Sequence, residues 1–196
     1  MGGGVQGLGC GLGDCQECCH NLAMVIPTLE TERLVLRAHR ADDIEDCAAL
    51  CGDAWVTRFI GGIPLTREEA WSRLLRYAGH WSLLGFGYWV VEEKATGKFL
   101  GEAGFADLRR AIAPPLGDTP EAGWVFASAA HGFGFASEAV GAIHAWGRSH
   151  FSTQGAVCLI HPENAASLLL AAKLGYIETG RSEYHGRTAV VLRRDW

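Results

Sequence analysis

Residues 129–139 read AAHGFGFASEA and follow a short apolar run at residues 124–127. After the glycines, helical spacing relates five apolar residues: Ala136, Ala139, Val140, Ile143 and Trp146. A strand, a glycine loop and a helix start are therefore expected in succession. A glycine loop at a helix start lets bare backbone N–H groups point at an anion, and the helix dipole adds positive partial charge. These residues alone leave two interpretations open, a phosphate-binding loop or glycines that only permit a tight turn.

Two common phosphate-binding motifs are excluded by the residues around this loop. The third glycine of the dinucleotide-binding pattern G-x-G-x-x-G would fall at Ser137. No Gly-Lys-Ser/Thr follows, as a P-loop would require. If the loop binds phosphate, it belongs to another class of site.

Outward from this loop, segments with period 2 alternate with segments of period 3.6. Thr66 and Glu69 form a capping box at one helix start, and residues 95–98 (ATGK) predict the turn of a hairpin. Strands are expected at 33–38, 88–92, 99–105, 124–127, 156–160, 176–179 and 188–192, and helices at 44–51, 66–81, 136–146 and 164–174. The order βααβββαβαββ predicts an α/β fold, a mixed and mostly antiparallel sheet flanked by helices.

Length and composition bound the class of protein. The 196 residues suit one domain, and 48% apolar with 20% charged residues lies outside the disordered regime. A net charge of -5 argues against a nucleic-acid binder. No apolar run of about 18 residues is present, so no membrane association is expected. The start lacks the basic and apolar regions of a signal peptide, which favours a cytoplasmic protein.

Residues 1–24 are rich in glycine and cysteine and are expected to be a disordered tail, with the folded domain at 25–196 and Met24 as its effective beginning. Cys15, Cys18, Cys19 and His20 lack the second, separated ligand pair of a structural zinc site, so no metal is expected. Gln6 stands where an N-myristoylation motif has Ser or Thr. Seven cysteines, an odd number, favour reduced thiols over a disulfide framework.

A second motif makes the pattern specific. PENAAS at 162–167 opens a helix directly after a strand, and the helix ends at LGY, 174–176. Strand, HGFGFASEA helix, strand, PENAAS helix and LGY together resemble the GNAT acetyltransferase family, over roughly residues 28–194. LETERLVLR at 29–37, RADD at 40–43, TREEA at 66–70 and GFGYWVV at 85–91 resemble the branch that includes the ribosomal-protein alanine N-acetyltransferases.

The resemblance implies an acetyl-CoA-dependent N-acetyltransferase in which a primary amine attacks the thioester directly in a ternary complex. The acceptor would be a protein N-terminus or a small-molecule amine, the cosubstrate acetyl-CoA, and the protein a monomer or homodimer without a metal. The alternative from another class is a non-catalytic acyl-CoA-binding module with the same fold. No feature of the sequence identifies the acceptor.

The resemblance also assigns the cofactor-binding residues. Backbone amides of the loop would hold the pyrophosphate, and they belong to His131, Gly132, Phe133, Gly134, Phe135 and Ala136. The family's first signature position, Arg or Gln, is Ala129 here, which removes one side-chain contact. Val125, Phe126 and Ala127 would line the cofactor, with the N–H of Val125 or Phe126 facing the thioester oxygen.

Asn164 and Ser167 carry two interpretations each. Asn164 would contact the pantetheine arm, and it is also a typical N-cap, two roles that can coexist. Ser167 would lie near the thioester sulfur and donate to the leaving thiolate, or it is an ordinary small residue on a helix face.

The remaining candidates concern proton transfer and the acceptor. Tyr176 matches a family position that often holds a general acid, although core packing accounts for it equally well. Glu121 matches an acidic residue that would accept the ammonium proton, directly or through water. Cys158, in an apolar run, is expected to be a buried small residue and not a nucleophile. Trp55 and Phe59, expected in a loop between the first helices, and Arg109 would contact the acceptor.

Overall fold

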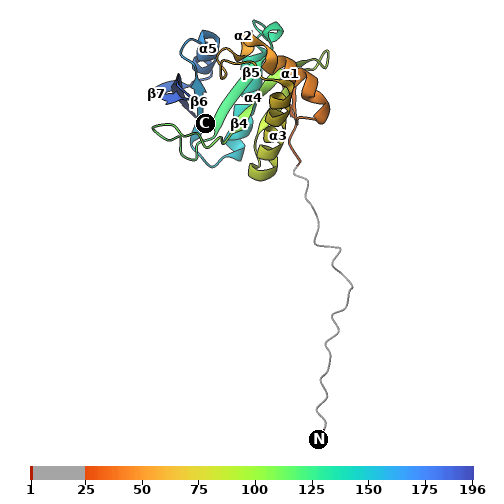
Figure 1. Cartoon of the computed structure of the whole chain (residues 1–196), viewed down its shortest axis with the longest axis horizontal. Coiled ribbons are helices and arrows are strands. Elements are labelled where there is room, and N and C mark those ends of the chain that lie inside the picture. Colours follow the sequence, from red (N-terminus) through yellow and green to blue (C-terminus); the bar gives the residue numbers. More distant parts are fainter. Residues whose placement is uncertain (2–24) are drawn as a thin grey trace.

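The computed structural model describes residue 1 and residues 25–196. The expected tail, with its four cysteines, its histidine and the proposed start at Met24, therefore lies outside the described residues apart from Met1. The domain that follows is one sheet with helices on both faces (Figure 1).

The elements follow the predicted order with two short additions. The strands are β1 Leu29–Glu30, β2 Leu34–Arg37, β3 Tyr88–Glu93, β4 Phe99–Ala106, β5 Glu121–Phe126, β6 Gly155–Ile160, β7 Ile177–Tyr184 and β8 Arg187–Asp195. The helices are α1 Ile44–Gly52, α2 Ala54–Thr57, α3 Arg67–Leu84, α4 Phe135–His150 and α5 Ala165–Lys173, with 3-10 turns at Ala41–Asp43 and Ser128–Ala130. The additions, β1 and α2, are too short for a periodic signal to reveal them.

The sheet order is β1-β2-β3-β4-β5-β6-β8-β7, and every neighbouring pair is antiparallel except β5 with β6. The predicted mixed, mostly antiparallel architecture is confirmed. β5 begins at Glu121, three residues before the apolar run that predicted it, because β4 pairs with it as far as Ala106. The Tyr88 side chain of β3 reaches over Gly104 to Gly123 of β5, where its hydroxyl takes the space that a Cβ would need.

The two faces of the sheet are covered by different helices. Side chains such as Trp89, Ala103 and Phe126 face the core beneath α4, together with Val140 and Ile143 of that helix. Residues that alternate with them face α1 and α3, which pack side by side (Figure 1). Among these, Val125 packs on Leu50 of α1 and Glu102 lies under α3. None of the described helices is both long enough and apolar enough to cross a bilayer.

The parallel neighbours β5 and β6 are paired only near their first residues. Their register contains a single pair, Glu121 with Val157, close to the start of each strand. Towards their carboxyl ends the two strands lack this pairing, and each then leads into a helix, α4 or α5. The gap between them is therefore bordered by two helix N-termini.

Candidate active site

The glycine loop adopts the conformation that its residues demand. Gly132 and Gly134 have φ of 85° and 80°, values that an L side chain adopts only with strain. Gly134 is the N-cap of α4, and no side chain caps this helix start. An added Cβ at Gly132 would meet nothing within 4 Å. The glycines are therefore required by backbone conformation and leave the space above the loop open.

Several amides of the loop have no partner. The first hydrogen bond of α4 runs from the amide of Glu138 to the carbonyl of Gly134, at 3.1 Å. Within residues 25–196 no acceptor faces the amides of the five residues from Gly132 to Ala136. These donors stand at the positive end of a 16-residue helix, where an anion is stabilised.

An ion pair with a residue near the start of the domain's sequence holds this loop in place. Arg33, just before β2, contacts Glu138 in the first turn of α4 at 2.6 Å and donates to the carbonyl of Phe133 at 2.9 Å. Its guanidinium also lies 4.7 Å from the ring centre of Phe135. Burial alone would raise the pKa of Glu138, but hydrogen bonds from Thr31 and Arg33 to the carboxylate keep this pKa below its usual range. The sequence carries no local signal for this contact, since its two residues lie 105 positions apart.

The register of β4 with β5 decides which amides face the gap. Ala127 donates its amide to Leu100 on the β4 side at 2.9 Å. Because successive residues of a strand point their backbone groups to opposite neighbours, Val125 also faces β4, whereas Trp124 and Phe126 face the gap beside β6. Of the two expected donors to the thioester oxygen, only Phe126 therefore has a suitable orientation. Trp124, which sequence reasoning did not name, shares it.

Across the gap, Asn164 and Ser167 meet at the start of α5. The Asn164 side chain accepts a hydrogen bond from the Ser167 amide at 3.2 Å, which confirms the N-cap interpretation. The side-chain N–H groups of Asn164 make no hydrogen bond within residues 25–196. The pantetheine contact and the role of the Ser167 hydroxyl stay predictions.

Glu121 lies on the other face of the sheet, in a bidentate ion pair with Arg110. Arg110 Nε and Nη2 donate to the two carboxylate oxygens at 2.6 and 2.7 Å. Burial opposes the charge on Arg110, but the contact with Glu121 raises the pKa of this guanidinium above its usual value. The expected acceptor residue Arg109 instead points into solvent, 82% exposed and paired with Asp107 at 2.8 Å. The backbone of Arg109 has a φ of 46°, so its side chain points in a different direction from that of Arg110.

The two aromatic residues expected to contact the acceptor lie close to the gap. Trp55 is on the helix α2, not in a loop as expected, and meets the ring of His131 edge-on at 4.8 Å. Phe59 stacks on His161 at 5.3 Å. Because His131 follows β5 and His161 follows β6, the α2 segment reaches from one side of the gap to the other. His131 is also bonded to the carbonyl of Phe126 at 3.2 Å, so its side chain helps to hold the loop.

Tyr176 is buried beneath the sheet on the α4 face, 6.5 Å from the ring of Trp124. Its hydroxyl lies 2.7 Å from Nε2 of His144 on α4. Cys158 is buried and free, as expected for a small core residue, and burial raises the pKa of its thiol well above the usual value. Because Glu121 is on the face of the sheet that α1 and α3 cover, its side chain and that of Tyr176 lie on opposite faces.

A buried polar network between β4 and α3 was not expected from the sequence. Glu102 of β4 is almost fully buried and contacts Arg73 at 3.0 Å and His39 at 3.1 Å. Burial alone would raise the pKa of Glu102, but Arg73 and His39 stabilise the carboxylate and keep this pKa below its usual value. His39, Cys47 and Glu102 bring three metal-ligating atoms within 4.8 Å of one another. Because Arg73 already neutralises the carboxylate, we interpret the group as a hydrogen-bonded network of the fold.

Comparison with known proteins gives a consistent picture. The family model described as an acetyltransferase (GNAT) domain matches residues 33–177. YoaA, an uncharacterized N-acetyltransferase of Bacillus subtilis (strain 168), is 28% identical over 161 residues, which cover 80% of this chain and 86% of YoaA. A solved GNAT-family protein from Bordetella pertussis is 32% identical with a TM-score of 0.75, covering 86% of this chain and 99% of that one.

A more distant solved structure shares the fold at 14% identity and a TM-score of 0.71. It is a ribosomal L7/L12 alpha-N-protein acetyltransferase in complex with coenzyme A, and the match covers 86% of this chain and 98% of that one.

Proposed function

The chain belongs to the GNAT acetyltransferase family, and from this premise we propose that it transfers the acetyl group of acetyl-CoA to a primary amine by direct attack in a ternary complex. The observation that carries the proposal is the group of partnerless amides at residues 132–136, which stands at the N-terminus of α4 beside the gap between β5 and β6. These amides donate to the pyrophosphate of the cosubstrate. A solved acetyltransferase that shares this fold is in complex with coenzyme A, which supports this choice of anion.

The gap provides the next contacts. It receives the pantetheine arm between the β5 amides and Asn164, and the Phe126 or Trp124 amide donates to the thioester oxygen. A backbone donor that is already oriented stabilises the negative charge that develops there, at little cost in reorganisation.

The proton and bond changes follow from this placement. The acceptor nitrogen forms a bond to the acyl carbon while the carbon–sulfur bond breaks. Glu121, held by Arg110, accepts the ammonium proton through water, and Ser167 or Tyr176 donates a hydrogen bond to the departing thiolate. The acceptor is a protein N-terminus or a small amine that enters beneath Trp55 and Phe59.

Turnover and binding are tested separately. Acetyl-CoA is incubated with N-terminal peptides and small primary amines, and free thiol is measured. Calorimetry gives the affinity for CoA in the wild type and in Gly134→Ala, which forces a Cβ into a left-handed conformation at a cost of about 1–2 kcal/mol. The free loop of the variant relaxes out of this conformation and CoA binding has to restore it, so the expected loss of affinity is about 5- to 30-fold.

Gly141→Ala on α4 is the matched control, because its helical backbone and open surroundings accept a Cβ. If Gly134→Ala binds CoA as tightly as wild type while remaining folded, the pyrophosphate does not lie on this loop. CoA binding without thiol release from any amine would favour the alternative, a non-catalytic acyl-CoA-binding module.

A further inference from the structure

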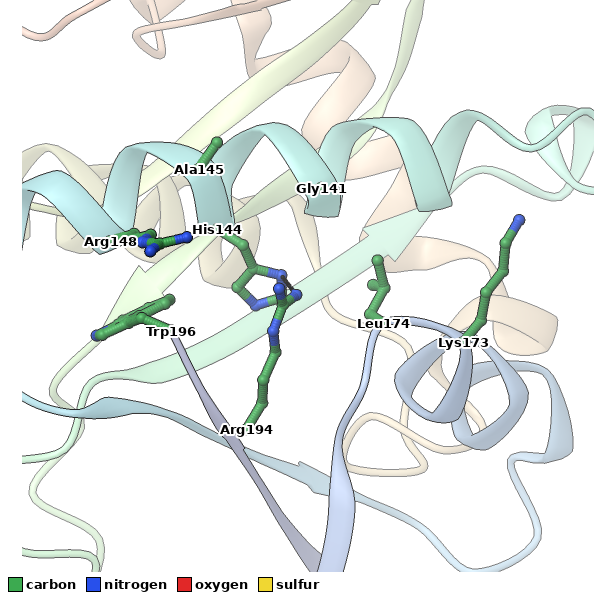
Figure 2. Close-up of a pocket in the computed structure, with 8 residues that line it drawn as sticks. All are labelled: Gly141, His144, Ala145, Arg148, Lys173, Leu174, Arg194 and Trp196. Carbon is green, nitrogen blue, oxygen red and sulfur yellow. Dashed lines mark hydrogen bonds between the residues drawn. The ribbon is translucent and has the colours of Figure 1, made fainter.

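The side chains of Arg194, His144 and Tyr176 form a hydrogen-bonded chain on the α4 face of the sheet. Arg194 of β8 lies with Nη1 3.0 Å from Nδ1 of His144, and Nε2 of His144 lies 2.7 Å from the hydroxyl of Tyr176. Figure 2 shows the His144 ring and the Arg194 guanidinium facing each other below α4, with a dashed line joining them. The chain thus runs from the surface of the domain to a buried phenol.

The chemistry of the three groups determines where the protons are. A guanidinium only donates, so Nδ1 of His144 must be the acceptor and carries no hydrogen. A neutral imidazole has one N–H, which must then be on Nε2 and donate to the Tyr176 oxygen. Burial, helped by the charge of Arg194, lowers the pKa of His144 to about 4, so the ring is neutral at pH 7.

The Tyr176 hydroxyl hydrogen must therefore point away from His144. Within residues 25–196 no acceptor receives it. The phenol lies beside Trp124 of β5, whose amide faces the gap, and near Cys158 of β6, so it has a neighbour on each of the two strands that border the gap. His144 lies about 14 Å along α4 from the glycine loop, a distance of the order of an extended pantetheine arm.

We propose that Arg194 and His144 are positioning residues that direct the Tyr176 hydroxyl hydrogen towards the sulfur of the bound cosubstrate. This inference rests on the proposed function. When the carbon–sulfur bond breaks, the sulfur keeps the electron pair, and the Tyr176 hydroxyl donates a hydrogen bond to the thiolate. Burial raises the pKa of Tyr176 well above its usual value, so the phenol keeps its proton and solvent water supplies the one that completes the thiol.

Arg194, the outer end of this hydrogen-bonded chain, is accessible from a groove between α4, α5 and β8. The groove is lined by Gly141, His144, Ala145, Arg148, Lys173, Leu174, Arg194 and Trp196, and it encloses about 480 Å³ (Figure 2). No carboxylate side chain lines it, so none competes with His144 for Arg194. The other ionisable groups near the phenol are Cys158 of β6 and Tyr88 of β3, both uncharged at pH 7 because burial raises their pKa values.

The first test is a double-mutant cycle on the turnover number. Tyr176→Phe is expected to lower kcat about 10- to 100-fold without changing the KM for acetyl-CoA. His144→Leu should lower kcat in the wild type but have no further effect in the Tyr176→Phe background, because His144 acts only through the hydroxyl. His144→Gln keeps an N–H donor near the Nε2 position and should restore most of the rate.

Arg194→Met supplies a readout that a structural role would not change. Without the guanidinium, neutral His144 can carry its hydrogen on either nitrogen and can accept the Tyr176 hydrogen, so kcat should fall several-fold at neutral pH. Below the pKa of His144, imidazolium again donates through Nε2. The rate ratio of Arg194→Met to wild type should therefore rise as the pH is lowered, and taking the ratio cancels the ionisation of the acceptor amine.

The tautomer can be measured without an acceptor. Nitrogen-15 NMR of the CoA-bound protein should show His144 with its hydrogen on Nε2, and the thiol pKa of bound CoA, followed by thiolate absorbance, should be higher in Tyr176→Phe than in wild type. A hydrogen on Nδ1, or His144→Leu lowering kcat equally in both backgrounds, would overturn the inference. If the wild type turns over and Tyr176→Phe has the same kcat, only this inference is wrong. If the wild type does not bind CoA, the proposed function is wrong.

Discussion

Glu121→Gln tests whether the buried carboxylate accepts the proton of the amine. The substitution keeps the size of the side chain and removes its basicity, and general bases contribute about 10²- to 10⁴-fold to rates. Arg110 already occupies one lone pair on each Glu121 oxygen, leaving about two for a water or an amine. We therefore expect a loss near the lower limit, about 10²-fold at pH 7, with CoA affinity unchanged. Raising the pH supplies free amine and should recover part of the rate.

The same variant has a cost in stability that must be separated from its chemistry. Gln presents an N–H where Glu121 accepted a bond, so Arg110, with four-fifths of its side chain buried, loses its counter-charge. An unsatisfied buried group costs about 1–3 kcal/mol, which for a chain of this length lowers the melting temperature by about 2–12 °C. Thermal denaturation measures this change.

The double variant Glu121→Gln with Arg110→Met distinguishes the two effects. Removing both charges relieves the unpaired guanidinium and should recover most of the stability. If Glu121 is the base, the rate should remain about 10²-fold below wild type. A double variant that recovers both stability and rate would show that the pair only supports the fold, and the assignment of Glu121 as base would be wrong.

Three further outcomes can be checked on the same preparation. Arg33→Met removes the contacts with Glu138 and with the Phe133 carbonyl, so calorimetry should find that CoA binds about 3- to 10-fold more weakly. Unchanged affinity would mean that the glycine loop keeps its conformation without Arg33. Glu102→Gln leaves Arg73 buried without a counter-charge, and urea unfolding should show a loss of about 3 kcal/mol; a loss below about 0.5 kcal/mol would contradict the buried network. His144 has a pKa of about 4 in the fold and about 6.5 unfolded, so the unfolded chain binds more protons between these values. Its contribution to stability is present above about pH 6.5 and is lost as the pH falls towards 4, and His144→Leu should lose less stability over this interval than wild type.

Much of the fold could be predicted because local rules decide it. The Thr66 capping box begins α3 as predicted, with Glu69 bonded back to the Thr66 amide at 2.8 Å. Gly132 and Gly134 adopt the left-handed backbone that glycine favours, and Asn164 caps α5. Each of these features depends on residues within one turn of each other, so their spacing in the chain is sufficient to find them.

The partners of the site residues could not be predicted in this way. Sequence reasoning chose Arg109, but the backbone turn at that residue sends Arg109 into solvent and Arg110 onto Glu121. Likewise, the choice between Val125 and Phe126 depends on which neighbour each amide faces. That orientation follows from the register of β4 against β5, which residues of β5 alone do not encode.

The sequence by itself determined the order of elements, the glycine loop at a helix start and membership of an acetyltransferase family, because periodicity, caps and motifs are properties of neighbouring residues. Only the tertiary structure decided that Arg33 holds that loop and that Arg194, His144 and Tyr176 form one chain. These contacts join residues between 32 and 105 positions apart. They exist because strand order and helix packing bring their side chains together in space, and this proximity in turn sets the pKa and the protonation state of His144.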